Sequence, residues 1–168
     1  MLRIDINSSR ELQATVLAIR QSERTIQAEI RKQTRGSILP EWQKGIREHA
    51  STRLEHRVLA DTARVTVSNQ NVTLKAGGLQ RKLSGGGRAV ELYAPTEFGT
   101  DREHRSTYSA TSRQGRRYDV TRRTRRQFRP LNRRGYAVYP TAADLIPRFA
   151  SLWVQTTVRT MHEIFERR

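Results

Sequence analysis

The chain has 168 residues, of which 35% are apolar, and its formal net charge is +16. Typical globular domains are about 45–50% apolar, so we expect one domain that leaves some surface for partners. Only four of the 32 basic residues are lysine, which leaves 28 arginines (32 − 4), and arginine binds phosphates and carboxylates through paired hydrogen bonds.

The lack of cysteine excludes a disulfide framework and thiolate metal sites. No apolar run approaches the ~18 residues that cross a bilayer, and no apolar signal core is present, so we expect a soluble protein without a membrane partner.

Helical periodicity begins after Ser8, a candidate N-cap with Glu11 three residues later. The apolar positions that recur at helical spacing are Leu12, Val16, Ile19, Ile26 and Ile30. We expect Gly36 and Pro40 to end this helix, and Ser37 to cap a second helix that carries Trp42.

The next segment, RVTVSNQNVTLKAG, alternates apolar and polar residues on both sides of an Asn-rich turn. This pattern predicts a β-hairpin whose apolar face holds Val65, Val67, Val72 and Leu74. The glycine-rich GGLQRKLSGGGR predicts a flexible loop, and RAVELYA predicts a strand that runs into the sharp segment PTEFGT.

Residues 101–134 have almost no apolar periodicity and are rich in Ser, Thr, Gly and Arg. Polar segments of this length inside a compact domain are typically functional or disordered. Strand-like alternation in YDVTRRTRRQF favours a hairpin, so we define about residues 101–135 as the basic arm of a single domain that spans residues 1–168.

The end of the chain returns to regular structure. NRRGYAVYP predicts a last short strand, with apolar contacts from Tyr136, Val138 and Tyr139. Helical spacing from Leu145 onward predicts a C-terminal helix, with Pro147 either in its first turn or at a kink after an earlier start near Thr141.

Together these elements predict an α+β fold. A small antiparallel β-sheet would pack with a long N-terminal helix, a second helix and a C-terminal helix, and the basic arm would extend from them as a long loop or hairpin.

No arrangement of residues predicts catalysis, a metal or a cofactor. The four histidines, His49, His56, His104 and His162, lack metal-ligand spacing. The phosphate-binding pattern GxxxxGKS/T and the nucleophile pattern GxSxG do not occur. The acidic residues are scattered, whereas a nuclease needs clustered carboxylates to hold divalent metals. We therefore expect a protein that is not an enzyme and has no metal or cofactor.

The segment from Arg113 to Arg134 holds ten arginines and one acidic residue, Asp119. The ten are Arg113, Arg116, Arg117, Arg122, Arg123, Arg125, Arg126, Arg129, Arg133 and Arg134. One interpretation is a solvated, mobile arm. The other is contact with DNA phosphates or with an acidic protein surface, and phosphate contact would be independent of base sequence and weakened by salt.

The segment ELYAPTEFGT resembles the YA…EFGT motif of the tail-completion or neck proteins of long-tailed bacteriophages. The matching residues are Tyr93, Ala94, Glu97, Phe98, Gly99 and Thr100. The order of predicted elements is also similar to that family, and charge and layout are broadly similar to the lambda minor tail protein Z.

This resemblance implies a structural virion protein at the junction of head and tail. It implies a homo-oligomeric ring, most often a hexamer, around the channel through which genomic DNA passes, formed in the host cytoplasm during assembly. Expected neighbours are connector, tail-terminator, tail-tube or tape-measure proteins. The alternative that the charge explains equally well is a free nucleic-acid-binding protein without sequence preference.

The motif also has a local physical interpretation. Pro95 predicts an extended Ala94, Phe98 can anchor a bend in the core, and Gly99 permits a turn that a side chain would obstruct. For Glu97 two roles stay open: pairing with an arginine of the same or a neighbouring subunit, or exposure to solvent.

Overall fold

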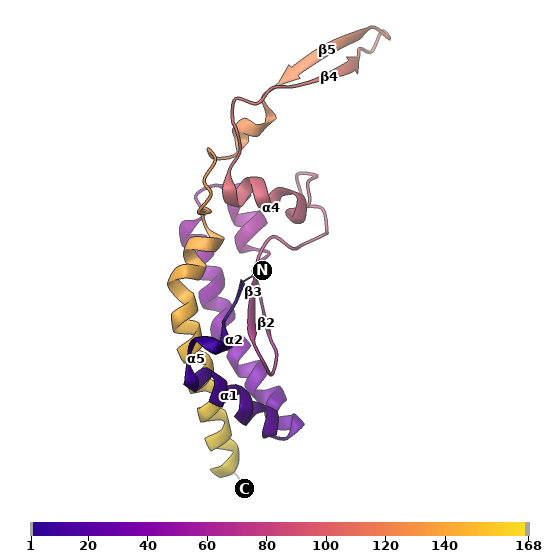
Figure 1. Ribbon diagram of the computed structural model, residues 1–168. Helices are drawn as coiled ribbons and strands as arrows, with labels where there is room; N and C mark the ends of the chain where they lie inside the picture. The colour runs from indigo at the N-terminus through magenta and orange to yellow at the C-terminus, as the bar shows by residue number, and fades with distance from the viewer. Residues whose placement is uncertain (1, 167–168) are drawn as a thin grey trace.

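The computed structural model describes residues 2–166, which form an elongated helical body from which a β-hairpin projects (Figure 1). The predicted α+β fold is confirmed. The body is built on two long helices that lie side by side, α2 (Arg24–His49) and α5 (Val138–Glu166). The shorter helix α1 (Arg10–Gln21) packs against the C-terminal part of α5.

The buried face of α2 repeats every four residues. It consists of Ile26, Ile30, Thr34, Ile38, Trp42 and Ile46. Such a row forms one continuous ridge that packs against a neighbouring helix, and α5 contributes the buried Phe149 and Trp153 to the same core. The buried residues keep the same spacing of four before and after Gly36 and Pro40, and α2 is continuous there. The predicted helix break at these residues is therefore wrong.

The first helical segment instead ends at Ser22. The Ser22 backbone N–H donates to the carbonyl of Ala18 at 3.2 Å, and its hydroxyl donates to that of Ile19 at 2.7 Å. At the other end of α1, Ser9 is the N-cap, and its hydroxyl accepts from Leu12 N at 3.2 Å. The predicted cap at Ser8 is wrong because Ser8 closes a short 3-10 turn, η1 (Ile6–Ser8).

A three-stranded antiparallel sheet covers one side of α2. Its strands are β1 (Leu2–Arg3), β2 (Arg64–Val67) and β3 (Val72–Lys75), in the order β1-β3-β2. Val65 faces Leu74 and Val67 faces Val72, which confirms the predicted hairpin and the apolar face shared by these four residues. The short helix α3 (Arg53–Glu55) and the π turn η2 (His56–Ala60) connect α2 to this sheet.

Two predicted strands are helices in the structure. RAVELYA and most of PTEFGT form α4 (Ala89–Phe98), with Pro95 inside it, so the extended conformation expected at Ala94 is also wrong. The segment around Tyr139 forms the start of α5 rather than a last strand, and Pro147 lies inside that helix, well beyond its first turn.

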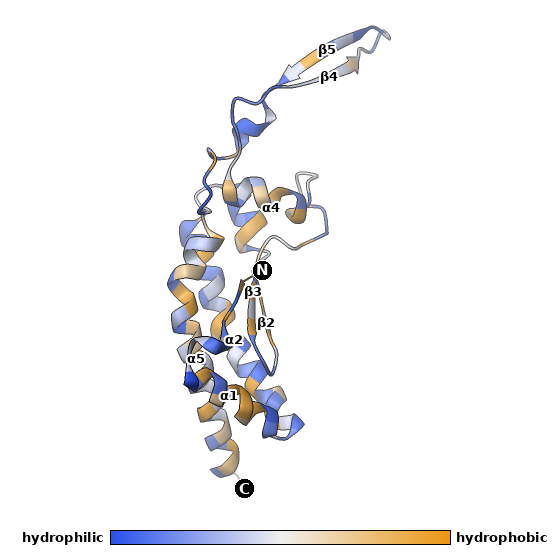
Figure 2. Ribbon diagram, in the orientation of Figure 1, coloured by the Kyte–Doolittle hydropathy of each residue, from blue (hydrophilic) through white to orange (hydrophobic). Residues whose placement is uncertain are grey.

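The arm forms the hairpin that the alternation of its residues favoured. Strands β4 (Ser106–Thr111) and β5 (Arg117–Arg122) pair antiparallel, and the 3-10 turn η3 (Thr124–Gln127) follows. Figure 2 shows that the arm is largely hydrophilic, with a short hydrophobic part on β5. Within residues 2–166 no helix combines the length and the apolar character needed to span a bilayer.

Candidate functional site

The hairpin of the basic arm stands away from the body (Figure 1). All side chains of β4 and β5 are exposed except those of Ala110 and Val120, which are half-buried. An isolated two-stranded hairpin is only marginally stable in water, and stable hairpins pack a face against something else. Within residues 2–166 the hairpin thus leaves both of its faces largely exposed.

The two faces of this hairpin differ in character. Tyr108 lies opposite Val120, and Ala110 lies opposite Tyr118, so these four side chains share one face. We call them the tyrosine face. Tyr108 is 45% exposed and Tyr118 is 52% exposed, so about half of the surface of these two side chains is uncovered. The other face is polar and carries Thr107, Ser109, Thr111, Arg117, Asp119 and Thr121.

The ten arginines do not form one uniform set. Four of them contact other residues of the chain through their side chains. Arg122 lies over the ring of Tyr108 at 5.7 Å from its centroid, Arg123 and Arg126 pair with Glu103, and Arg129 pairs with Glu55. The six that have no ion-pair or ring partner within residues 2–166 are Arg113, Arg116, Arg117, Arg125, Arg133 and Arg134.

Glu103 connects the two sides of the arm below the hairpin. Its carboxylate accepts from Arg126 Nη2 at 3.0 Å and lies 3.2 Å from Arg123 Nη1. The hydrogen bond and the charge of Arg126 lower the pKa of Glu103 from its ordinary value, with a further contribution from Arg123. The carboxyl group is fully exposed, so this contact orders the arm locally and adds little to global stability.

The EFGT part of the motif joins the arm to the body. Backbone hydrogen bonds run from Tyr136 N to Glu97 O at 2.9 Å, from Asn132 N to Phe98 O at 2.7 Å, and from Thr100 N to Arg129 O at 2.9 Å. We call residues 97–100 and 129–137 the anchor. Because both ends of the arm pass through it, the anchor fixes the direction in which the arm leaves the body.

Glu97 is completely buried at the start of α5. Its Oε2 accepts from Ala137 N at 3.2 Å and from Val138 N at 2.9 Å, and its Oε1 accepts from Tyr139 N at 3.0 Å. The first N–H groups of a helix lack partners within the helix and favour negative charge. Both roles left open for Glu97 are wrong, since it neither pairs with an arginine nor faces solvent.

Two glycines make room for the anchor. Gly99 has φ +71, and a Cβ there would overlap the carbonyl of Pro130. Gly135 has φ +78, and a Cβ there would overlap the carboxylate of Glu97. The turn expected at Gly99 is thus confirmed, and its cause is close approach of two backbone segments.

The aromatic residues around the motif pack on one another. Phe98 lies between Tyr93, at a ring-centroid distance of 6.4 Å, and Tyr139, at 5.3 Å. Burial raises the pKa of Tyr93 above its ordinary range, and the nearby Glu97 raises it further. Tyr93 is therefore neutral at physiological pH. Ala94 is exposed on α4 and takes no part in this packing.

A second buried acid, Glu55, clamps the other side of the anchor. Two of the three guanidinium nitrogens of Arg129 contact its carboxylate, with Nε–Oε1 at 2.9 Å and Nη2–Oε2 at 3.0 Å. The carboxylate also accepts from Ser51 N at 2.7 Å. The guanidinium also lies 4.6 Å from the ring centroid of Tyr136. Sequence reasoning missed this role, although Thr52 and Glu55 form a capping box that was readable as T-x-x-E.

The structure thus brings the motif and Arg129 together in the anchor and leaves most other arm arginines exposed. Within residues 2–166 no group of three or more His, Asp or Glu side chains could hold a metal ion. A scan against protein-family models and searches of curated proteins and of solved structures found no match.

Proposed function

We propose that this protein is a structural subunit of the bacteriophage head–tail junction, where it forms a ring around the DNA channel and joins tail to head. The proposal rests on the resemblance of ELYAPTEFGT to tail-completion and neck proteins, and on the part that these residues play in the fold. Every residue of EFGT contributes to the anchor that directs the arm. A motif with this role would be needed in any subunit that must present an arm at a defined angle.

The observation that carries the proposal is the uncovered tyrosine face at the end of an anchored arm. Tyr108 and Tyr118 are about half exposed, and tyrosine is enriched where protein surfaces meet. A free nucleic-acid-binding arm could also use the two rings for base stacking, but Ala110 and Val120 beside them add an aliphatic surface that is typical of protein contacts. We therefore assign the tyrosine face to contact with a neighbouring protein, either another subunit of the ring or an adjoining connector or tail protein.

In this proposal, the six arm arginines without an ion-pair or ring partner within residues 2–166 contact DNA phosphates in the channel or acidic side chains of neighbouring proteins. Six copies at +16 would place a formal charge of +96 (6 × 16) around a polyanion. Phosphate contacts of this kind are independent of sequence and screened by salt, which suits a channel through which DNA has to move. In this proposal the protein is not an enzyme and resides in the virion, after assembly in the host cytoplasm.

A free, sequence-independent nucleic-acid-binding protein is the second candidate. The six arm arginines without an ion-pair partner among residues 2–166 favour it, because unpaired arginines bind phosphates readily. In this candidate the rings of Tyr108 and Tyr118 would stack on bases, and the aliphatic Ala110 and Val120 would have no role.

Replacement of both tyrosines, Tyr108→Ser with Tyr118→Ser, leaves every charge in place and tests the docking role, because only a head–tail junction subunit should then fail to join heads to tails. For a head–tail junction subunit we expect heads and tails that no longer join, measured as unattached heads and tails by electron microscopy of lysates. The control is Thr107→Ser with Thr121→Ser on the polar face, which should join normally. Normal joining by the tyrosine variant would contradict the docking role of this face.

A further inference from the structure

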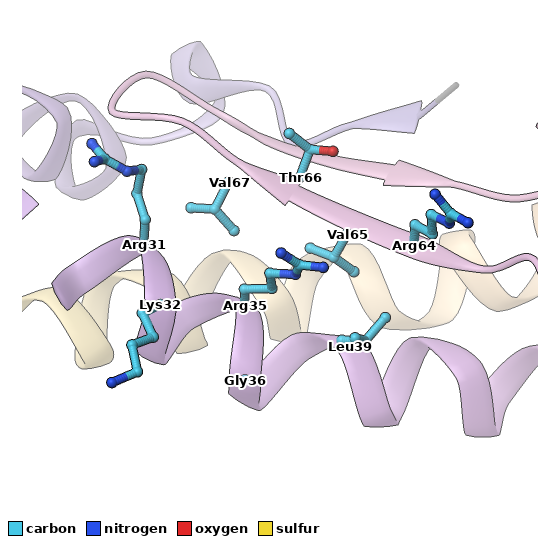
Figure 3. A pocket seen from close by; sticks show the side chains of 9 residues that line it. All are labelled: Arg31, Lys32, Arg35, Gly36, Leu39, Arg64, Val65, Thr66 and Val67. Atoms are coloured by element: carbon cyan, nitrogen blue, oxygen red, sulfur yellow. The ribbon is translucent and has the colours of Figure 1, made fainter. Parts of the chain in front are cut away.

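A hollow on the body lies between α2 and the edge strand β2, on the half of α2 that is remote from the arm (Figure 1). It has a volume of about 620 Å³, and four cations line it, Arg31, Lys32, Arg35 and Arg64. Among residues 2–166, no acidic side chain lines it. Figure 3 shows Arg31 and Arg35 rising from α2 toward the strand, whereas Lys32 points away from it. We call this hollow the α2–β2 groove.

The charge of the groove is only partly neutralised. Lys32 lies 3.9 Å from Glu29, and Arg31 donates to the side-chain oxygen of Asn69. Arg35 and Arg64 are exposed and have no ion-pair partner within residues 2–166. Two free guanidinium groups on opposite walls can each take a carboxylate of one extended ligand.

The groove also has an aliphatic lining, made by Leu39, Val65 and Val67. In the part of the chain that the structure describes, no aromatic side chain lines it. Nucleic-acid grooves usually offer aromatic rings on which bases stack, whereas aliphatic side chains with flanking cations match a peptide that alternates apolar and acidic residues. Val65 is only 3% exposed, whereas Leu39 and Val67 are half-buried, so Leu39 and Val67 provide most of the aliphatic surface that a ligand can contact.

Gly36 is among the residues that line the groove and is exposed. A Cβ at Gly36 would meet no atom of residues 2–166 within 4 Å. A larger side chain would therefore fit there without a clash within the chain, so this position can be used to probe the groove.

We propose that the α2–β2 groove binds an extended acidic segment of a partner protein. A second copy of this chain is a poor occupant, since its own projecting segment, the arm, is strongly basic. In a head–tail junction the acidic segment would belong to an adjoining protein. The inference does not depend on that function, because it rests on the groove and not on the arm.

The test uses the full-length protein and a fluorescein-labelled peptide, Glu-Val-Glu-Val-Asp-Val-Glu, at physiological salt. The groove variant is Arg35→Glu with Arg64→Glu. The matched control is Arg113→Glu with Arg116→Glu on the arm, and both variants lower the formal charge from +16 to +12 (16 − 4). We expect the groove variant to weaken binding by about tenfold or more, and the arm control by less than about twofold, because charges far from the groove are screened.

Two further probes test the chemistry of the occupant. A peptide in which glycine replaces each valine keeps the charge and loses the aliphatic contacts, so we expect it to bind several-fold more weakly. Gly36→Leu should also weaken binding of the valine peptide, while the fold, measured by circular dichroism, stays intact.

The proposal would be overturned by equal losses in the groove variant and the arm control, which would indicate attraction by net charge alone. It would also be overturned if the glycine peptide bound as tightly as the valine peptide, or if a short oligothymidylate displaced the peptide from the groove and bound more tightly. None of these results would bear on the joining of heads and tails, so the inference and the proposed function fail separately.

Discussion

Gly135 and Glu97 are in contact at the start of α5, where the glycine leaves room for the buried carboxylate that caps the helix. The two residues are 38 positions apart (135 − 97) and lie on opposite sides of the arm. Their contact fixes the beginning of α5 relative to the end of α4. The presentation of the arm therefore depends on a small buried contact in the body.

Gly135→Ala tests this contact. The residue has φ +78, and its new Cβ would overlap Glu97, so we expect a loss of about 2–4 kcal/mol in the free energy of unfolding. The measurement is urea denaturation followed by circular dichroism. Gly86→Ala is the matched control, since Gly86 has φ +92 but open space around it. Equal losses in both variants would show that backbone strain alone, and not the contact with Glu97, governs Gly135.

Glu97→Gln should lower the free energy of unfolding, although the two side chains have nearly the same shape. The amide can no longer accept all three N–H groups of Ala137, Val138 and Tyr139, and its own N–H groups would face them, so we expect a loss of about 2–3 kcal/mol. Glu103→Gln, which changes an exposed acid, should stay within about 0.5 kcal/mol of wild type. A neutral effect at Glu97 would contradict its role as the cap of α5.

Arg129 and Arg116 should behave differently although both belong to the arginine-rich segment. Arg129→Gln leaves the buried Glu55 without its cation, so we expect a loss of about 3 kcal/mol or more. Arg116→Gln should change stability by less than about 0.5 kcal/mol. Thermal or urea unfolding of the two variants measures this difference, and similar small effects would mean that the Glu55–Arg129 pair does not hold the anchor.

The titration of Glu103 reports on order in the arm. Because its pKa is lowered in the folded chain, the contact is fully present above the ordinary value of 4.5 and is lost as the pH falls through the lowered pKa. We expect NMR titration of the side-chain carboxyl to give a pKa below 4.5. Arg126→Gln should move that pKa back toward its ordinary value, and an unchanged titration in this variant would show that Arg126 is not its partner.

The sequence predicted those parts of the fold whose signals are local and uninterrupted. The alternation around Val65 and Leu74 gave the hairpin because burial of one face fixes its register. The helix break predicted at Gly36 and Pro40 was wrong, because the helix propensity of single residues is a weak signal compared with the burial of a whole helix face. The spacing of four residues along the buried row from Ile26 to Ile46 was visible in the sequence. Burial of this row outweighed the helix-breaking tendency of Gly36 and Pro40.

The anchor could not be predicted in the same way. RAVELYA has the β-branched and aromatic residues of a strand, but it forms α4, whose buried residues Ala89, Thr96 and Glu97 pack in the body. The N-terminus of α5 has its cap on another helix, about 40 residues earlier in the chain. A cap that comes from a residue so distant in the sequence cannot be recognised from the residues next to the helix. The exposure of the arm, in contrast, followed directly from its lack of apolar periodicity.

The most direct test of the proposed function is cryo-electron microscopy of particles from a strain that carries a tagged copy of this protein. The account predicts a ring of density at the junction of head and tail, with the tyrosine face of each arm against a neighbouring protein. Absence of the tag from particles, together with its distribution over cellular nucleic acid, would contradict the account and favour a free nucleic-acid-binding protein.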